Sequence, residues 1–284
     1  MAVVIAIDAG TTGVRAFALD EDGTPAGWSY REFTQHFPRP GWVEHDADEI
    51  WSQICATLGE LCGRLAESGR TVAAVGITNQ RETLVAWSRR TGRPRARAIV
   101  WQDRRTAERC EALAEAGHLP LVRRTTGLVL DPYFSATKAA WLLTEGGVEA
   151  DDDLALGTID AWVLWNLTGG TAAAGAQHAT EPSNACRTLL FDGRALAWSA
   201  DLAELFGVPL GALPEVRRSS GELGRTAPGA TALPGGIPIS GAAGDQQAAL
   251  FGQACFEVGM TKNTYGTGSG QVGPTFISTN EPVP

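Results

Sequence analysis

The chain has 284 residues, 44% of them hydrophobic and 19% charged, which is the composition of a folded globular protein. Its formal net charge of −9 argues against a nucleic acid or an anionic membrane as a partner, because both favour basic surfaces. The sequence has no apolar run of about eighteen residues, and its five cysteines form no CxxC pair, so we expect a cytoplasmic protein with reduced thiols.

Three segments at the start of the chain predict an antiparallel β-meander. Residues 3–7 and 16–19 are short apolar runs typical of buried strands, and residues 30–37 alternate more weakly between apolar and polar types. Turns rich in Gly, Thr and Asp separate the three segments, as expected of tight connections between neighbouring strands.

A helix is predicted next, because Asp46 can cap it and apolar residues recur at helical spacing from 50 to 65. Glu49 follows Asp46 at the spacing of a capping box. Small and polar residues predict irregular loops over 172–185 and 221–236. The other predicted elements are strands over 71–78, 98–101 and 237–240, and helices over 104–116, 136–143, 159–167 and 246–253.

This order of elements favours an α/β fold. A meander followed by alternating helices and strands is typical of the ribonuclease-H-like domain of actin-like and hexokinase-type ATPases. The motifs described next support the same architecture.

The turn between the first two predicted strands carries residues suited to binding phosphate. Gly13 and its neighbours allow backbone N–H groups to approach an anion, and Thr11 and Thr12 add hydroxyl donors. Arg15 could pair with phosphate, and Asp8 could hold a hydrated magnesium ion. A hairpin turn that uses Gly and Thr only for their conformation is an equal alternative.

A second group of residues suits a polyol. Arg81 and Glu82 follow a buried strand, and together they offer donors and acceptors for neighbouring hydroxyls. Trp101 could pack on the C–H face of such a ligand, and the hydroxyl of Tyr133 could reach it. The alternatives are a solvated turn for Arg81 and Glu82, a core position for Trp101 and a loop cover for Tyr133.

Asp245 follows a glycine-rich turn and precedes an apolar helix. It could be an N-cap, for which aspartate is a preferred residue, or a base that deprotonates an attacking hydroxyl. Thr267 lies in a Gly-Thr-Gly turn that resembles the first phosphate loop in composition, so two such loops could hold a polyphosphate from both sides.

Glu44, His45 and Asp46 form a cluster that superficially suggests a metal site. The three residues are consecutive, so their side chains diverge, and Asp46 is already assigned to the helix cap. We therefore do not expect a metal ion at this cluster.

Taken together, these motifs resemble the FGGY family of carbohydrate kinases and, within it, the glycerol kinases most closely. The resemblance runs in family order to about Gly268. The matching stretches are ITNQRET at 77–83, TGLVLDPYFSATK at 126–138, GTID at 157–160, SNACRTLLFD at 183–192, AGDQQAALFGQ at 243–253 and KNTYGTG at 262–268.

The resemblance implies a role for each candidate residue. Asp245 falls at the position of the catalytic base, and Asp8 and Asp245 fall near the magnesium ion. The implied ATP-phosphate positions are Thr11, Thr12, Gly13, Arg15 and Thr267. The implied polyol-binding positions are Arg81, Glu82, Trp101, Tyr133, Asp245 and Gln246.

The chain also departs from the family pattern. Glycerol kinases commonly carry Gln and Ser where this chain has Ala9, Gly13 and Val14, and an aromatic residue where Ser269 and the residues after it stand. The resemblance predicts a substrate-binding domain over 1–252 and only the start of a nucleotide-binding domain over 253–284.

The implied activity is the magnesium-dependent transfer of phosphate from ATP to glycerol, giving glycerol 3-phosphate. We expect poor turnover by this chain alone, because most of the second domain lies beyond its end. The alternatives are a kinase of the same family that acts on another sugar or polyol, and a non-catalytic polyol-binding fragment. The expected partners are glycerol or a similar polyol, ATP or ADP and, in a homo-oligomer, a second copy of the chain.

Overall fold

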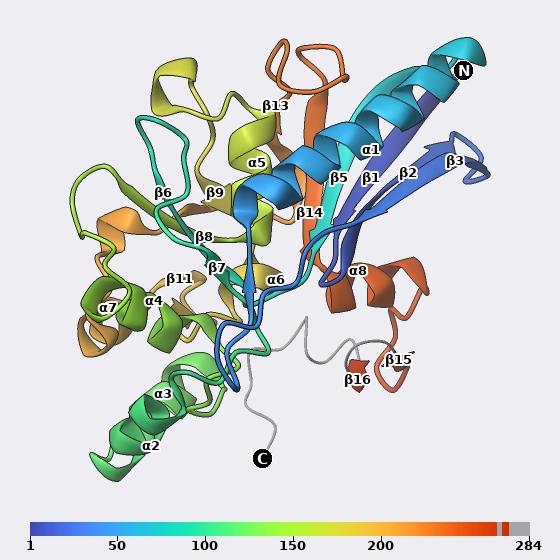
Figure 1. Cartoon of the computed structure of the whole chain (residues 1–284). Helices are drawn as coiled ribbons and strands as arrows, with labels where there is room; N and C mark the ends of the chain where they lie inside the picture. The colour runs from blue at the N-terminus through green and yellow to red at the C-terminus, as the bar shows by residue number, and fades with distance from the viewer. Residues whose placement is uncertain (266–268, 273–284) are drawn as a thin grey trace.

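A six-stranded sheet forms the centre of the computed structural model, which describes residues 1–265 and 269–272 (Figure 1). The predicted meander is present, and β1, β5 and β14 run parallel to one another. The strands lie in the order β13 (Ser220–Arg225), β14 (Pro238–Gly244), β5 (Thr71–Asn79), β1 (Ala2–Ala9), β2 (Gly13–Asp20) and β3 (Pro25–Glu32).

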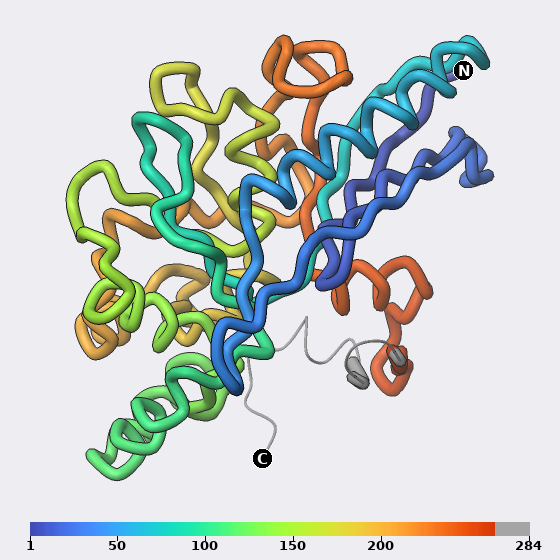
Figure 2. Tube along the Cα trace, in the orientation of Figure 1, coloured from blue at the N-terminus to red at the C-terminus, as the bar shows by residue number. Residues whose placement is uncertain are grey.

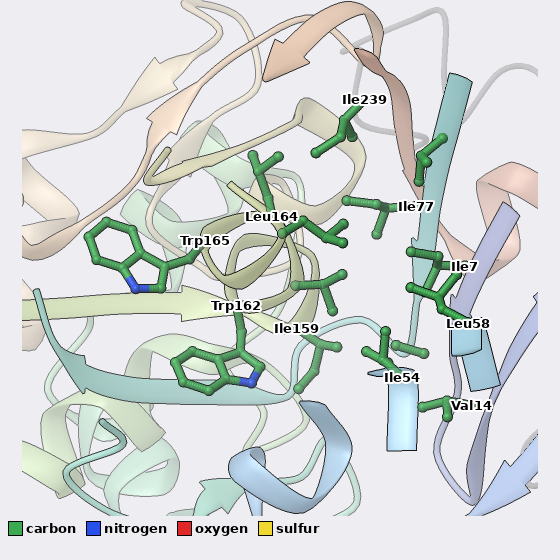
Figure 3. Close-up of a cluster of buried hydrophobic side chains, with 14 of the residues drawn as sticks. Ile7, Val14, Ile54, Leu58, Ile77, Ile159, Trp162, Leu164, Trp165 and Ile239 are labelled. Carbon is green, nitrogen blue, oxygen red and sulfur yellow. The ribbon is translucent and has the colours of Figure 1, made fainter. Parts of the chain in front are cut away.

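One face of this sheet is covered by α1 (Ala47–Glu67) and α5 (Ile159–Leu167), which enclose the main hydrophobic core. Figure 3 shows the side chains from the two helices meeting those of the strands. The labelled members of this core are Ile7, Val14, Ile54, Leu58, Ile77, Ile159, Trp162, Leu164, Trp165 and Ile239.

A second sheet lies on the other side of α5, in the strand order β4 (Glu44–His45), β7 (Ala98–Ile99), β6 (Leu84–Ser88) and β8 (Leu154–Thr158). The ring of Trp87 in β6 contacts the rings of Trp162 and Trp165 in α5, at centroid distances of 5.5 and 6.0 Å. Because α5 packs against both sheets, it is apolar almost all round rather than along one stripe.

The remaining elements surround the second sheet or follow β14. Figure 2 shows α2 and α3 as paired turns that project from the body of the molecule. Their bounds are α2 (Ala107–Glu115), α3 (Leu119–Thr126), α4 (Ser135–Thr144), α6 (Pro182–Ala185), α7 (Ala200–Phe206), α8 (Asp245–Gly252), β9 (Ala179–Thr180), β10 (Phe191–Asp192), β11 (Ala197–Trp198), β12 (Glu215–Val216), β15 (Lys262–Tyr265) and β16 (Ser269–Val272), with 3₁₀ turns at Ala172–Ala174 and Leu210–Ala212. No helix in the described ranges is long and apolar enough to cross a membrane.

Asp46 caps α1 as predicted, accepting hydrogen bonds from the N–H groups of Asp48 (2.9 Å) and Glu49 (3.2 Å). The predicted capping box is wrong. The Glu49 carboxylate instead accepts hydrogen bonds from the backbone N–H and the hydroxyl of Thr34, both at 3.0 Å. These two donors lie just after β3, so Glu49 ties that connection to the helix rather than closing its own first turn.

Two segment predictions also need correction. The third strand begins at Pro25, not at residue 30. The chain reverses in a turn in which the Gly23 N–H donates to the Asp20 carbonyl, so the strand can pair with β2 soon after that turn. The predicted loop over 221–236 is strand at its beginning, where β13 pairs with the edge of β14. A strand at this edge satisfies the backbone groups that β14 would otherwise leave unpaired.

His178 is a partly buried histidine that the fold holds neutral. Its Nε2 lies 2.9 Å from the Leu156 carbonyl oxygen, and its ring stands edge-on to Trp87 at 5.1 Å. Burial lowers the pKa of His178 from 6.5 to about 4, the Leu156 carbonyl opposes this, and nearby Arg89 adds to it.

We therefore expect His178 to stabilise the fold above pH 6.5 and to lose that contribution as the pH falls toward 4. Unfolding takes up a proton in this window, because the unfolded imidazole has the higher pKa. The loss between pH 7 and pH 5 should be about 2 kcal/mol. Urea unfolding at both pH values should give a smaller pH dependence for His178→Phe than for the wild type, whereas equal dependences would contradict a neutral His178.

Candidate functional site

Polar loops follow β1 and β5, and helix α8 follows β14, at the edge of the sheet where these parallel strands end (Figure 1). The strands end level with one another, since Asp8 pairs with Thr78 and Gly244 pairs with Asn79. The structure thereby brings together three segments that the sequence singled out separately: the turn after Asp8, the Arg81 segment and Asp245.

Arg81 and Asp245 form an ion pair across this edge, with Arg81 Nε 3.0 Å from Asp245 Oδ1. The N–H of Gln246 donates to the same oxygen at 2.7 Å. In the part of the chain that the structure describes, Oδ2 has no hydrogen-bond partner, and the side chain of Asp245 is 42% exposed. The carboxylate is thus held by one oxygen and open at the other.

The interpretation of Asp245 as an N-cap is wrong. Gly244 is the N-cap of α8, and Asp245 is the first residue of the helix, because β14 runs directly into it. Gly244 is also required by packing, since a Cβ atom there would lie 2.5 Å from Cδ of Arg81. The glycine lets the stem of Arg81 cross the strand end to reach Asp245.

Glu82 has a strained backbone, a feature that the sequence does not reveal. Its φ is +62°, and the N–H of Thr83 donates to the Arg81 carbonyl at 2.7 Å, which closes a three-residue turn around Glu82. For a residue with a side chain such a conformation costs about 1–3 kcal/mol and is typical of functional sites. The hydroxyl of Ser135 holds the Glu82 carbonyl at 2.8 Å.

Glu82 is 1% exposed. Its carboxylate forms an ion pair with Arg187, whose Nε lies 2.7 Å from Glu82 Oε1. Burial raises the pKa of Glu82, and the charges of Arg187 and Arg81 oppose part of that rise. The Arg187 guanidinium also lies 4.9 Å from the centre of the Phe134 ring. Arg187 was not among the predicted site residues, although it falls inside the matching stretch at 183–192.

Trp101 and Tyr133 stand edge to face, with ring centroids 5.5 Å apart. The buried ammonium of Lys138 donates to the carbonyl oxygens of both residues, at 3.3 and 3.1 Å. Burial lowers the pKa of Lys138 to about 7, which the carboxylates of Asp103 and Glu82 partly oppose. The two aromatic residues therefore share one buried anchor.

The turn after β1 is closed by a hydrogen bond from the Gly10 N–H to the Gly13 carbonyl at 3.0 Å. A Cβ atom on Gly13 would lie 2.5 Å from the Arg31 carbonyl oxygen, so neighbouring β3 explains why a glycine stands here. Thr12 is exposed beside this turn, and Arg15 lies opposite Asp8 on β2.

Asp8 and Thr78 are paired in register and so lie on the same face of the sheet. Burial raises the pKa of Asp8, the charge of Arg15 opposes this, and the charge of Asp245 adds to it. The buried hydroxyl of Thr78 has no partner within the described residues. Two carboxylates that repel each other beside an unpartnered hydroxyl are a donor set that suits Mg²⁺, which binds oxygen and keeps several waters.

The described residues contain no group of three or more His, Cys, Asp or Glu placed to hold a metal, so any ion here would need such mixed ligands. Gln246 accepts a hydrogen bond from Lys262 Nζ at 2.7 Å, and burial lowers the pKa of Lys262. Lys262 is a further neighbour of Asp245 that was not predicted. Thr267 lies outside the described residues.

The cluster at 44–46 diverges as expected. Glu44 pairs with Arg105 at 2.8 Å, Asp46 caps α1, and His45 is buried between two glutamines.

Comparison with known proteins identifies the group to which this site belongs. A sequence profile described as the N-terminal domain of the FGGY family of carbohydrate kinases matches residues 3–252. The chain belongs to the FGGY family. Its mixed α/β fold, with the ribonuclease-H-like sheet order, is the fold expected from the sequence.

Individual relatives agree with this assignment. A glycerol kinase of Bordetella parapertussis is 54% identical over 269 residues, covering 93% of this chain and 52% of that protein. The structure of Plasmodium falciparum glycerol kinase with ADP matches with a TM-score of 0.88 at 33% identity, over 95% of this chain and 53% of that one. A xylulose kinase of Lactobacillus acidophilus shares the fold at 17% identity, with a TM-score of 0.83 over 95% of this chain and 53% of that one. The chain spans about half the length of the curated relatives it matches.

The Glu82–Arg187 pair gives a test of the site's electrostatics. We expect Arg187→Met to lower the free energy of unfolding by about 3 kcal/mol, because it leaves a buried carboxylate without its cation. The double variant that adds Glu82→Gln should recover most of this loss, since neither charge then remains. Urea unfolding of the wild type, both single variants and the double variant measures the coupling, and additive losses would show that the pair is not electrostatically linked.

Proposed function

We propose that this chain provides the polyol-binding part of a kinase that transfers phosphate from ATP to glycerol, giving glycerol 3-phosphate. The observation that carries the proposal is the open Oδ2 of Asp245, beside a carboxylate, two arginines and two aromatic rings. Asp245 is close enough to Glu82 and Tyr133 for its charge to influence the pKa of each. The similarity to glycerol kinases supports glycerol as the polyol.

In the proposed reaction Asp245 accepts the proton of the attacking hydroxyl at Oδ2. Arg81 and the Gln246 N–H hold Oδ1, so the carboxylate cannot rotate away from its substrate. Phosphoryl transfer asks mainly for positioning and charge stabilisation, which such a fixed carboxylate provides.

We assign the binding of the polyol to Arg81, Glu82, Trp101, Tyr133 and Gln246. Glu82 offers an acceptor for hydroxyls, and its bond to Arg187 keeps that acceptor in place. The edge-to-face pair of Trp101 and Tyr133 offers an apolar wall for the carbon side of the ligand. A small polyol needs both kinds of contact, because each of its carbons carries a polar hydroxyl as well as apolar C–H bonds.

We assign the binding of the ATP phosphates to Thr11, Thr12, Gly13 and Arg15. Thr267, in the second domain, is assigned to the same phosphates. Asp8 and Asp245, with the hydroxyl of Thr78, are assigned to Mg²⁺. The ion would supply positive charge that neutralises the phosphoryl oxygens. We assign residues 1–252 to the substrate-binding domain and 253–284 to the start of the nucleotide-binding domain.

The role of Asp245 can be tested in a longer protein that spans the full length of the glycerol kinase relatives. Asp245→Asn keeps an oxygen for Arg81 and Gln246, so the free energy of unfolding should change by less than about 0.5 kcal/mol. Turnover with glycerol should fall by roughly 10²–10⁴, the usual contribution of a positioned base. Melting curves and steady-state assays over a panel of polyols measure both, and full activity in the variant would remove Asp245 from the mechanism.

Arg81 tests the polyol assignment. Arg81→Ala should weaken glycerol binding by about 1.5–3 kcal/mol, the value of a hydrogen bond to a charged group, and leave ADP binding nearly unchanged. Calorimetry with each ligand separately gives the comparison. The control is Arg225→Ala, which removes an arginine that pairs with Glu222 at the surface. Equal losses for glycerol and ADP in Arg81→Ala would contradict the assignment.

A further inference from the structure

A closed ring of hydrogen bonds connects the turn after β1 to Trp101. From Thr11 it passes through Gln35, His45, Gln80 and Thr83 to Trp101, and Trp101 then returns to Thr11. His45, Gln80 and Thr83 are almost completely buried. We call these six residues the hydrogen-bonded ring.

The two glutamines have only one possible orientation in this ring. Gln35 Nε2 donates to the Thr11 carbonyl at 3.0 Å, and Gln80 Nε2 donates to the Gly10 carbonyl at 3.0 Å. A carbonyl can only accept, so each amide nitrogen must face the turn. The Gln80 oxygen then accepts from the Thr83 hydroxyl at 2.8 Å.

These orientations determine the protonation of His45. Its Nε2 lies 2.7 Å from the oxygen of Gln35 and must carry a proton. Its Nδ1 lies 3.3 Å from the nitrogen of Gln80 and must accept one. Only a neutral imidazole protonated at Nε2 can make both bonds.

The last hydrogen bond of the ring orients the Thr11 hydroxyl so that it can donate to an anion. The indole N–H of Trp101 is a donor only, and it lies 3.0 Å from Thr11 Oγ1. The Thr11 hydroxyl must therefore accept here, and among the described residues no acceptor takes its own proton, which is available to a ligand. At the other end, the backbone N–H of Trp101 donates to the Thr83 hydroxyl at 3.2 Å.

We propose that His45 is a positioning residue for both parts of the site, with its neutral Nε2–H imidazole closing the ring that holds the phosphate turn against Trp101. This inference rests on the proposed function for the identity of the ligands. His45 touches neither ligand, so its effect reaches them only through Thr11 and Trp101.

The first test is the tautomer of His45 in the 284-residue chain. Long-range ¹H–¹⁵N spectra at pH 7 should show a protonated Nε2 and a bare Nδ1. An Nδ1–H tautomer or a charged ring would overturn the proposal, whatever the chain binds.

The second test compares three variants of the same chain. His45→Phe keeps the aromatic packing against Phe33 but removes both bonds. His45→Gln places an amide nitrogen near the position of Nε2 and keeps the bond to Gln35. His178→Phe is the control, since it removes another neutral histidine, which is partly buried and lies outside the ring.

Two measurements apply to each variant: amide hydrogen exchange in the turn at residues 10–13, and glycerol affinity by calorimetry. His45→Phe should raise the exchange rates and the glycerol Kd by about tenfold each, as expected for the loss of one to two buried hydrogen bonds. His45→Gln should restore most of the exchange protection, and His178→Phe should change neither value.

Unchanged exchange and affinity in His45→Phe would overturn the proposal, as would equal effects in His178→Phe. If the wild-type chain does not bind glycerol, the polyol assignment fails, and the tautomer and exchange results still decide whether His45 positions the turn.

Discussion

The common register of β1, β5 and β14 is the constraint on which the rest of the site depends. Since Asp8, Thr78 and Gly244 lie at the same level of the sheet, the segments that follow these strands must meet in a small volume. A shift of one residue in β1 or β5 would turn Asp8 or Thr78 toward the core face and an isoleucine away from it. The packing of α1 and α5 on the opposite face prevents such a shift, because it buries Ile7 and Ile77 completely or nearly so.

The site concentrates features that weaken a fold. Asp8 and Glu82 are carboxylates in places where burial raises the pKa of each, and the Glu82 backbone is strained. The Thr78 hydroxyl has no partner in the described part of the chain. Three further buried atoms lack a partner among the described residues, Trp87 Nε1, Arg89 Nε and Gln247 Oε1, whereas the buried Glu181 carboxylate accepts five hydrogen bonds. Ligand atoms are the natural partners for the groups that remain unsatisfied at the strand ends.

Local patterns in the sequence were enough to predict β1, β2, α1, β5 and α5, because each has a strong periodicity or clear boundaries, whereas the weak alternation of the third strand gave the wrong bounds for β3. They did not predict β6 and β8, which are short apolar runs between loops that periodicity cannot separate from helix. The motifs identified Arg81 and Asp245, but the sequence could not show that they touch. Arg187 and the hydrogen-bonded ring were missed for a similar reason: their contacts join residues up to about a hundred positions apart, and only the folded sheets bring them together.

The close packing of Gly244 against Arg81 limits how this site can evolve. Any side chain at 244 would occupy the space of the Arg81 stem, which lies 2.5 Å from the position a Cβ atom would take. The two positions therefore cannot vary independently, and a larger residue at 244 becomes acceptable only after a shorter one has replaced Arg81. Such a dependence is epistasis, in which the effect of a substitution at 244 depends on the residue that stands at 81. A lineage that replaced Gly244 with a larger residue would have to replace Arg81 first.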